Sequence, residues 1–573
     1  MWTVIKRRLT RPVDCASQFR NFSASSVVES SALSVLPSAK SEPADLYINP
    51  ICMQMDKMIL KANAAEDILT ILVTHRGALF VQNLVTAIDS LADLSLREIP
   101  FSTTRKMKFP DQYEEVQRDR LLTDPRYSLL VRDLIEYSGK LDIASIQRIL
   151  ESLQSLNHCH YKLFGAVLRR LYSMEIPPAD LSSAISIGCS LEWGGFGRAE
   201  TFYNRLGDHL ISGIQSLSTL DFVNAVTMYS KLPKIYPELL HRFSLETCHR
   251  IATLSDRHIG YLSLALSAYG GDVVPSVKSA IRSAANELCN RIDSADLRDL
   301  VRLAISLRRT NIGHIPLLTK SLNRFVAELE VVRSQRERLD PSLATISDLS
   351  QLVDACAHFG IGDPGQLSAV ILPHIQDSVD VVTEEASIRI LHTLARFPSA
   401  ITPSTVPIVN LLIRKIGSTS STSWEKQKIK LMFIWFSKCM RFPISCDSEI
   451  RRFIIDQCLN QYLVARRGYM VPFPEDSKIL WDMIVEAGLS DFAEFNSWVP
   501  NSPFHADILI REHRVAVLVL SQFDSLNPSV PVGTDAIQCD LIRNLGWEVV
   551  AIDRRKIRDH PNIDQIRQFL VHR

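Results

Sequence analysis

The feature that most constrains the fold of this chain is a helical pattern that repeats with a period of about 38 residues. From about residue 63 to residue 440, apolar residues recur at intervals of three and four, and strand-like alternation is scarce. If the end of the first helix of each hairpin is taken as an anchor, most anchors lie about 37–39 residues apart, and one spacing is about 52 residues. These anchors are Leu156, Trp193, Leu232, Tyr269, Leu307, Phe359, Phe397 and Phe436. The pattern predicts helical hairpins that stack into an all-α helical-repeat solenoid.

Residue types that end helices support the same phase. Gly194 and Gly360 each come directly after an anchor, where glycine takes the left-handed conformation without steric penalty. Pro398 follows another anchor and cannot continue a helix. We therefore expect the solenoid to cover residues 61–440, with connecting helices over residues 441–502.

Two features modify this regular array. The single long spacing, between Leu307 and Phe359, contains the charged segment 333–340. Its excess over the repeat period predicts an insertion of about 14 residues near positions 330–345. Residues 83–91 (NLVTAIDSL) match residues 224–232 (NAVTMYSKL) in length and at several positions, which predicts an early repeat ahead of the main array.

Gly360, Gly362 and Gly365 spell GxGxxG, a motif that binds dinucleotide phosphates when it follows a strand and opens a helix. Here the motif follows a helical run at a repeat anchor. We interpret it as a turn and expect no nucleotide cofactor.

Composition excludes several classes of protein. The 64 Lys and Arg residues nearly balance the 63 Asp and Glu residues, so a nucleic-acid interaction must depend on local patches. The eleven cysteines form no CxxC pair, and the cluster His158, Cys159, His160 lacks a second cluster at ligand spacing, which argues against structural zinc. No apolar run approaches the roughly 20 residues that span a bilayer. We expect no metal, no cofactor and no membrane span.

The N-terminus has the composition of an organellar import sequence. The segment 1–22 carries five Lys or Arg residues against one acid, and Ser-rich sequence follows. Arg20, Phe22 and Ser23 resemble the pattern recognised by the mitochondrial processing peptidase, which predicts cleavage after Phe22. A basic tail without a targeting role is the alternative. Residues 23–60 are expected to be a disordered linker and lead-in.

The C-terminal segment changes to a mixed α/β pattern. Strands are predicted over His505–Ile510, residues 514–520 and residues 547–552, a helix over residues 535–545, and a last helix after Asn562. This order predicts a compact module with a small mixed sheet over residues 503–573.

The strand carrying Asp507 and the phrase LIRNLGWEVVAID of residues 541–553 resemble the RAP domain, which ends mitochondrial and chloroplast RNA-processing proteins. The FAST kinase-type proteins of animals share the plan of transit peptide, helices and terminal RAP domain. The repeat period is similar to that of octotricopeptide and heptatricopeptide arrays. The resemblance implies a fold of the PD-(D/E)xK nuclease class and single-stranded RNA as the ligand.

The resemblance also places a nuclease site, which looks degenerate. Such nucleases hold a divalent metal with an acid on one strand and an acid near a Lys on the next strand. Asp507 supplies the first acid, but Leu518 and Leu520 occupy the next positions and cannot ligate a hard cation. Hydrolysis would require a substitute from the loop, Asp524 or Asp535. A structural role for Asp507, bonding to local backbone, is the alternative.

Five basic residues are candidates for binding RNA. They are Arg543 on the predicted helix and Arg554, Arg555, Lys556 and Arg558 after the last strand. Clustered cations neutralise phosphates with salt-dependent affinity, although such runs also occur as solvated faces. Trp547 is a possible base-stacking residue, but its place at the start of a strand favours packing.

We therefore expect a non-catalytic RNA-binding factor of the mitochondrial matrix that acts in rRNA or mRNA processing, stability or ribosome assembly. Its expected partners are single-stranded mitochondrial RNA or rRNA and, beside them, mitochondrial ribosomal proteins. The alternatives are a structural component of the mitochondrial ribosome and a metal-dependent RNA endonuclease. A helical array that binds protein is a further alternative, and a plastid-type organelle is the rival compartment.

Overall fold

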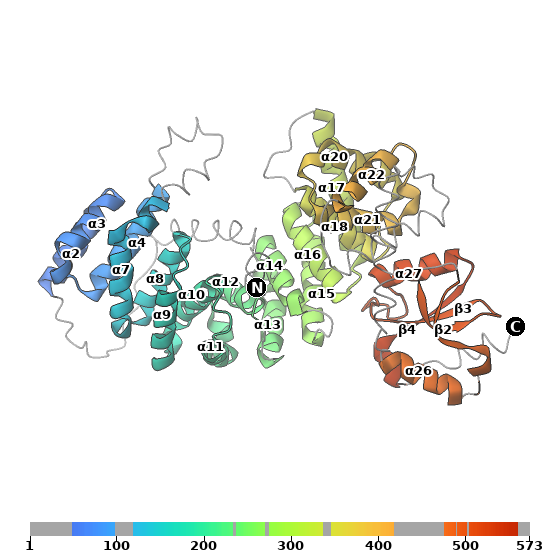
Figure 1. Ribbon diagram of the computed structural model, residues 1–573, viewed down its shortest axis with the longest axis horizontal. Helices are drawn as coiled ribbons and strands as arrows, with labels where there is room; N and C mark the ends of the chain where they lie inside the picture. The colour runs from blue at the N-terminus through green and yellow to red at the C-terminus, as the bar shows by residue number, and fades with distance from the viewer. Residues whose placement is uncertain are drawn as a thin grey trace, which may run out of the picture.

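The computed structural model describes residues 49–97, 119–232, 237–269, 274–335, 345–417, 475–486, 488, 490–500 and 504–559. Most of these residues are helical, and a small four-stranded sheet lies near the C-terminal end. Figure 1 shows the helices side by side along the molecule, with the sheet at the end opposite to the first helices. The predicted division into a helical part and a small α/β part is confirmed at this level.

The helices of the array form two rows, because each helix packs on the second helix after it along most of the chain. The first row consists of α2 (Pro50–Lys61), α4 (Val81–Arg97), α8 (Ile143–Ser155), α10 (Leu181–Trp193), α12 (Thr219–Tyr229), α14 (Asp256–Leu266), α16 (Leu297–Thr310), α18 (Ile346–His358) and α21 (Glu384–Arg396). The second row consists of α3 (Ala65–Thr74), α7 (Pro125–Glu136), α9 (Tyr161–Ser173), α11 (Glu200–Gly213), α13 (Pro237–Arg250), α15 (Pro275–Asn290), α17 (Ile315–Gln335), α20 (Leu372–Asp377) and α22 (Val406–Gly417). One helix of each row makes a hairpin, and consecutive hairpins stack.

The described anchors lie at, or within three residues of, the C-terminal ends of the first-row helices. Leu156, Phe359 and Phe397 come directly after α8, α18 and α21, and Trp193 is the last residue of α10. The GxGxxG motif starts two residues after α18 and ends at Gly365 inside the short helix α19 (Pro364–Gln366), so it follows a helix rather than a strand. The anchor Phe436 lies outside the described residues.

The predicted start of the array is wrong. α2 begins at Pro50, inside the expected linker of residues 23–60, and it buries Met55 and Ile59 as it packs on α4. The helix starts there because the Asn49 side chain accepts a hydrogen bond of 3.0 Å from the Ile51 N–H, and proline fits the first helical position.

Part of the predicted insertion near residues 330–345 is explained by helix length. α17 has 21 residues, whereas its neighbour α15 has 16. Residues 336–344 lie outside the described part of the chain.

Basic side chains join the second-row helices. In six hairpins a cation donates a hydrogen bond to a main-chain carbonyl at, or just after, the C-terminal end of the preceding second-row helix. The pairs are Arg170 with Leu141, Arg205 with Leu171, Arg250 with Leu217, Arg291 with Leu254, Arg324 with Ile292 and Lys415 with Val382. The last carbonyls of a helix lack partners within the helix and carry partial negative charge. The cations therefore satisfy carbonyls at these helix ends and fix the spacing of the hairpins.

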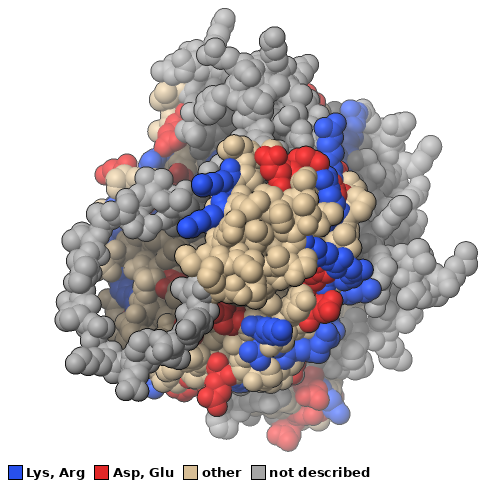
Figure 2. All heavy atoms as spheres, turned by 90° about the vertical axis from the view of Figure 1, so that its left-hand side faces the viewer, with Lys and Arg blue, Asp and Glu red and all other residues tan. Residues whose placement is uncertain are grey.

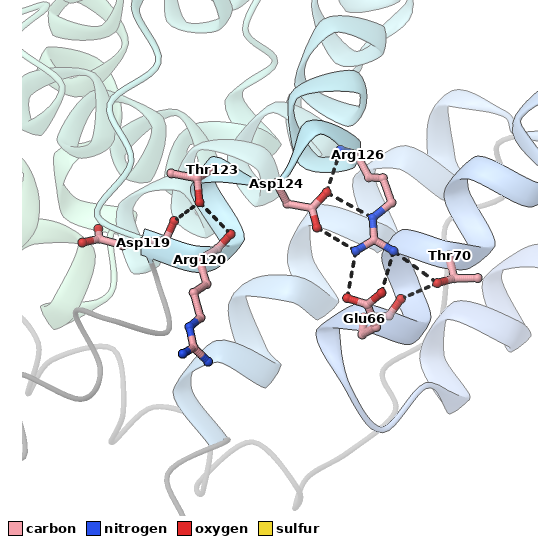
Figure 3. Close-up of polar contacts among 7 residues, drawn as sticks. All are labelled: Glu66, Thr70, Asp119, Arg120, Thr123, Asp124 and Arg126. Carbon is pink, nitrogen blue, oxygen red and sulfur yellow. Dashed lines mark hydrogen bonds and ion pairs between the residues drawn. The ribbon is translucent and has the colours of Figure 1, made fainter.

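The first hairpins are also joined by an arginine. The Arg126 guanidinium on α7 binds both carboxylate oxygens of Glu66 on α3, at 2.7 and 2.8 Å, and the Asp124 carboxylate at 2.7 Å. Figure 3 shows the guanidinium between these two acids, with Thr70 beside it. Asp124 also caps α7 by accepting from the Arg126 N–H, so one side chain connects a helix start to the neighbouring helix.

The N-terminal end of the array exposes apolar side chains. Figure 2, which faces this end, shows a broad uncharged surface bordered by charged residues. The exposed apolar residues of the first two helices and the turn before α4 are Ile51, Met53, Leu60, Val73 and Phe80. The end repeat of a stack leaves one face without a neighbouring repeat. No helix in the described ranges is both long and apolar enough to cross a membrane.

The α/β domain begins earlier than predicted. It contains α26 (Glu475–Glu486), β1 (Glu494–Trp498), β2 (His505–Ile510), β3 (Val515–Leu520), α27 (Gly533–Asn544), β4 (Glu548–Asp553) and the short helix η13 (Arg554–Asp559). The predicted boundary at residue 503 is therefore wrong, because α26 and β1 belong to this domain. Residues 418–474 lie outside the described residues, and they include the end of the predicted array and most of the predicted connecting helices. The helix expected after Asn562 also lies outside them.

The four strands lie in the order β1-β2-β3-β4. β1, β2 and β3 pair antiparallel, and β4 pairs parallel to β3. α26 packs on one face, where Leu480 and Ile484 join Ile508 and Val517. α27 covers the other face, which is the side toward the helical array in Figure 1.

The carbonyl-binding arginines predict a local effect on stability. Arg250 donates to the carbonyls of Leu217 and Ile214 at 2.8 and 3.1 Å and binds Glu246 at 2.6 Å. We expect Arg250→Ala to lower the free energy of local unfolding around α11 and α13 by about 1.5–3 kcal/mol, because these bonds involve a charged donor. Hydrogen exchange of the amides in these helices measures the change.

Arg242→Ala on the same helix is the matched control. Arg242 is half exposed, and among the described residues it pairs with Glu238 alone, four residues earlier, so its removal should change stability by no more than about 0.5 kcal/mol. Equal effects of the two substitutions would contradict the role given to the carbonyl contacts.

Candidate nucleic-acid interface

Asp507 lies on β2 and both of its carboxylate oxygens accept hydrogen bonds. One oxygen accepts from the Ser477 hydroxyl of α26 at 2.5 Å, and the other accepts from the Val519 N–H of β3 at 2.7 Å. Burial raises the pKa of the Asp507 carboxyl, although the two hydrogen bonds oppose this shift. The carboxylate therefore connects two strands and a helix, in keeping with the structural alternative.

The next strand offers no partner for a metal. Leu518 and Leu520 are buried, with 1% and 5% of their surfaces exposed, in the apolar cluster that includes Leu541 of α27. All six residues of β3, VAVLVL, are apolar. No register of this strand places a carboxylate or a Lys beside Asp507.

The two acids that would have to replace these ligands, Asp524 in the loop after β3 and Asp535 in the first turn of α27, are held elsewhere. The Asp535 carboxylate accepts from the main-chain N–H groups of Ser521 and Gln522 at 3.0 and 2.9 Å. The Asp524 carboxylate accepts from the N–H of Gly313, in the helical array, at 3.1 Å. Each acid thus stabilises a loop or an interface.

The predicted basic residues do not form one patch. Arg554 pairs with Asp476 at the start of α26, and the guanidinium of Arg555 binds Asp553 at 2.7 Å. About half of each arginine side chain is exposed, whereas both acids are buried. Asp476 precedes the Asp507 partner Ser477, so Arg554 and Asp507 lie at the same end of the sheet.

Arg543 lies apart from these residues. It is on α27, on the opposite face of the sheet from α26, and it pairs with Asp540 at 3.2 Å. The side chains of Lys556 and Arg558 lie outside the part of the chain whose side chains the structure describes, as do all atoms of Arg20, Phe22 and Ser23. Trp547 is 9% exposed and joins the apolar core, as its position at a strand start predicted.

The α/β domain and the array meet in an interface, called the seam below, that was not predicted from the sequence. The loop after β3 reaches the C-terminal end of α16, where the Ser525 N–H donates to the Asn311 carbonyl at 2.6 Å. The Ser525 hydroxyl donates to the Thr310 carbonyl at 3.1 Å and accepts from the Lys278 ammonium of α15 at 3.1 Å. The loop therefore supplies polar partners for an exposed helix end.

α27 completes the seam. It packs on α18, and its Asp540 forms an ion pair with Arg396 of α21. Its first residue, Gly533, lies beside His358 of α18. Burial lowers the pKa of His358 to about 3, so the ring is neutral near pH 7 and forms a hydrogen bond of 2.8 Å with Asn311.

His158, Cys159 and His160 act as helix and turn residues. His158 bonds to the Tyr127 hydroxyl at 2.9 Å, Cys159 to the Gly194 carbonyl, and His160 caps α9. Among the described residues, no group of three or more His, Cys, Asp or Glu side chains is arranged to hold a metal ion.

Comparison with known proteins returned no match, either to a family model or to a curated sequence. The function proposed below therefore rests on the geometry of the site and on the sequence resemblance.

A side chain at position 533 should disturb the seam, because Gly533 lies within it. Its φ of +59° is left-handed, and an added Cβ would lie 2.4 Å from Nδ1 of His358 and 2.7 Å from the Gln522 side chain. We expect Gly533→Ala to separate the domain from the array, because α18 must move or the loop must open. Hydrogen exchange should rise at least severalfold in residues 310–314 and 521–532.

Gly546→Ala controls for backbone strain alone. Gly546 has a φ of +80°, but its nearest neighbour is Arg514 Nη1 at 3.6 Å. This variant should loosen the turn before β4 and leave the seam unchanged. A seam that opens equally in both variants would show that strain, and not contact with α18, is responsible.

The raised pKa of Asp507 makes the stability of the α/β domain depend on pH. A raised pKa means that the folded state holds the proton more tightly than the unfolded chain, whose Asp pKa is about 3.9. Stability from this carboxyl is therefore complete below that value and is lost as pH rises through the folded pKa. Asp507→Asn cannot ionise, so its domain should gain stability relative to wild type as pH rises above about 4.

Hydrogen exchange of β2 and β3 amides at several pH values tests this expectation. A relative stability of the Asn variant that falls with rising pH would contradict it. Asp507→Ala, which leaves the buried Val519 N–H without its acceptor, should lose about 1–3 kcal/mol below about pH 4. This loss should shrink as pH rises, because alanine cannot ionise either.

Proposed function

We propose that this protein is a non-catalytic RNA-binding factor of the mitochondrial matrix, in which a helical solenoid holds single-stranded RNA beside a C-terminal domain of the RAP type. It would act on rRNA or mRNA in processing, stabilisation or ribosome assembly. The compartment rests on the basic sequence that precedes Ser23 and on its expected cleavage after Phe22.

The arrangement of the α/β domain supports the RAP assignment. A helix, three antiparallel strands, a second helix and a parallel strand form a mixed sheet with one helix on each face. This architecture is compatible with the PD-(D/E)xK class that the resemblance implies. Asp507 lies on an inner strand, beside the strand that would carry the remaining nuclease residues.

The non-catalytic interpretation rests on one observation: both carboxylate oxygens of Asp507 already accept hydrogen bonds from the protein. The adjacent strand VAVLVL carries no side chain with an oxygen ligand. A divalent metal needs several oxygen ligands in one place.

Crosslinking RNA to the protein in isolated mitochondria, followed by sequencing of the bound RNA, tests the proposal. We expect enrichment of defined mitochondrial transcripts or rRNA segments over a mock purification. If no RNA is enriched, or if the protein is found outside mitochondria, the proposal is wrong.

Two further measurements separate the rival functions. An assembly or processing factor should sediment with ribosomal particles at far less than one copy each, whereas a stoichiometric level would identify a ribosomal subunit. Purified protein with Mg²⁺ or Mn²⁺ should leave single-stranded RNA intact. Cleavage that is abolished by Asp507→Asn, with the fold retained, would instead identify a nuclease.

A further inference from the structure

The first row of helices is not uniform in charge. α10, α12 and α18 carry no Lys or Arg, whereas α16 carries four arginines and one acid within 14 residues. The arginines are Arg298, Arg302, Arg308 and Arg309. α16 packs on α14, on α18 and on the second row. These arginines therefore lie on or beside the stripe that the neighbouring helices leave uncovered.

Buried acids hold two of these arginines at the surface. Asp299 is 4% exposed and pairs with Arg302, and Asp354 is 1% exposed and pairs with Arg308 at 2.8 Å. The acids face inward, whereas the Arg308 side chain is 41% exposed and the Arg302 side chain is 15% exposed. Arg309 is exposed and has no carboxylate partner among the described residues. Arg309 therefore contributes positive charge that no described carboxylate balances.

An aromatic ring extends this surface onto α14. The Arg302 guanidinium lies over the Tyr261 ring, 4.2 Å from its centroid, and donates to the Tyr261 hydroxyl at 3.3 Å. Arg257 approaches the same ring at 5.9 Å. Arginine planes and aromatic rings are the groups on which unpaired bases stack, and nearby cations bind the phosphates between them.

The C-terminal end of α16 is also where the α/β domain is attached, since Thr310 and Asn311 accept from Ser525. RNA bound along α16 would therefore continue directly onto the α/β domain.

We infer that the exposed surface of α14 and α16, formed by Arg257, Tyr261, Arg298, Arg302 and Arg309, is the main site at which the array binds the phosphates and bases of single-stranded RNA. This inference rests on the proposed function and adds to it the location of the RNA. An acidic protein is the competing ligand, but the stacked planar groups favour RNA.

The test uses the full chain and a fluorescein-labelled single-stranded RNA of mixed sequence, about 30 nucleotides long, with anisotropy read over a series of salt concentrations. The variant is Arg298→Gln with Arg309→Gln, which leaves the partners of Asp299 and Asp354 in place. We expect roughly tenfold weaker binding at about 0.1 M salt. The slope of log K against log salt should fall by about 1.4, or about 0.7 for each lost phosphate contact.

The control variant is Arg169→Gln with Arg242→Gln, which removes two exposed cations from the second-row helices α9 and α13. It should bind within about twofold of wild type. Arg309→Gln alone should lower the slope by about 0.7, and this single change at an exposed position keeps the test valid if the double variant fails to fold.

The outcomes separate the two proposals. Wild-type protein that binds no RNA would contradict the proposed function itself. Equal weakening in variant and control, or no weakening in either, would overturn the inference and leave RNA binding intact. Polyglutamate that competes as well as unlabelled RNA would identify an acidic-protein site and would also overturn it.

Discussion

No hairpin of this array can bury its apolar face alone, and the rest of the structure depends on that constraint. A single apolar cluster runs from Ile59 in α2 through both rows of helices to Leu541 of α27 and Trp547. Burying this surface is the main favourable term, but apolar contact alone sets neither spacing nor direction. The arginines that bind carbonyls at, or just after, the C-terminal ends of the preceding second-row helices tie each hairpin to the one before it, because a guanidinium satisfies carbonyls that would otherwise lack partners.

The α/β domain is attached by the same chemistry. The N–H and hydroxyl of Ser525 donate to main-chain carbonyls at the end of α16. Asp540 pairs with Arg396. Acids and hydroxyls that resemble site residues in the sequence, such as Asp524, are used for attachment instead. The proposed non-catalytic function is compatible with this use of the acids. The polar groups of the domain hold it in position beside the basic surface of α16.

The parts of the structure that depend on local sequence were predictable. Helix ends at Trp193, Phe359 and Phe397 follow from apolar spacing and from the Gly or Pro that comes next, and β2 was located at its observed bounds. β1 was missed because its sequence EFNSW has weak alternation and gains its stability from pairing with β2. The start of α2 was missed because the expected linker extended to residue 60, although Ile51, Met55 and Ile59 recur at helical spacing after the capping residue Asn49.

The candidate site was less predictable, because its properties depend on residues far apart in the sequence. Asp507 was located correctly, but its partner Ser477 comes from a helix 30 residues earlier. The sequence gives Arg554 no acidic partner, whereas in the structure it pairs with Asp476, 78 residues away. The four arginines of α16 were visible in the sequence, yet their exposure could not be known without the helices that pack around them.

The central claim is that RNA lies on the α14 and α16 surface next to the attached α/β domain. Ultraviolet crosslinking in isolated mitochondria, followed by mass spectrometry of the RNA-linked peptides, tests it most directly. The account predicts that crosslinked peptides come mainly from Asp256–Leu266 and Leu297–Thr310. Crosslinks confined to second-row helices such as α9 and α13, or a complete absence of crosslinked peptides, would contradict it.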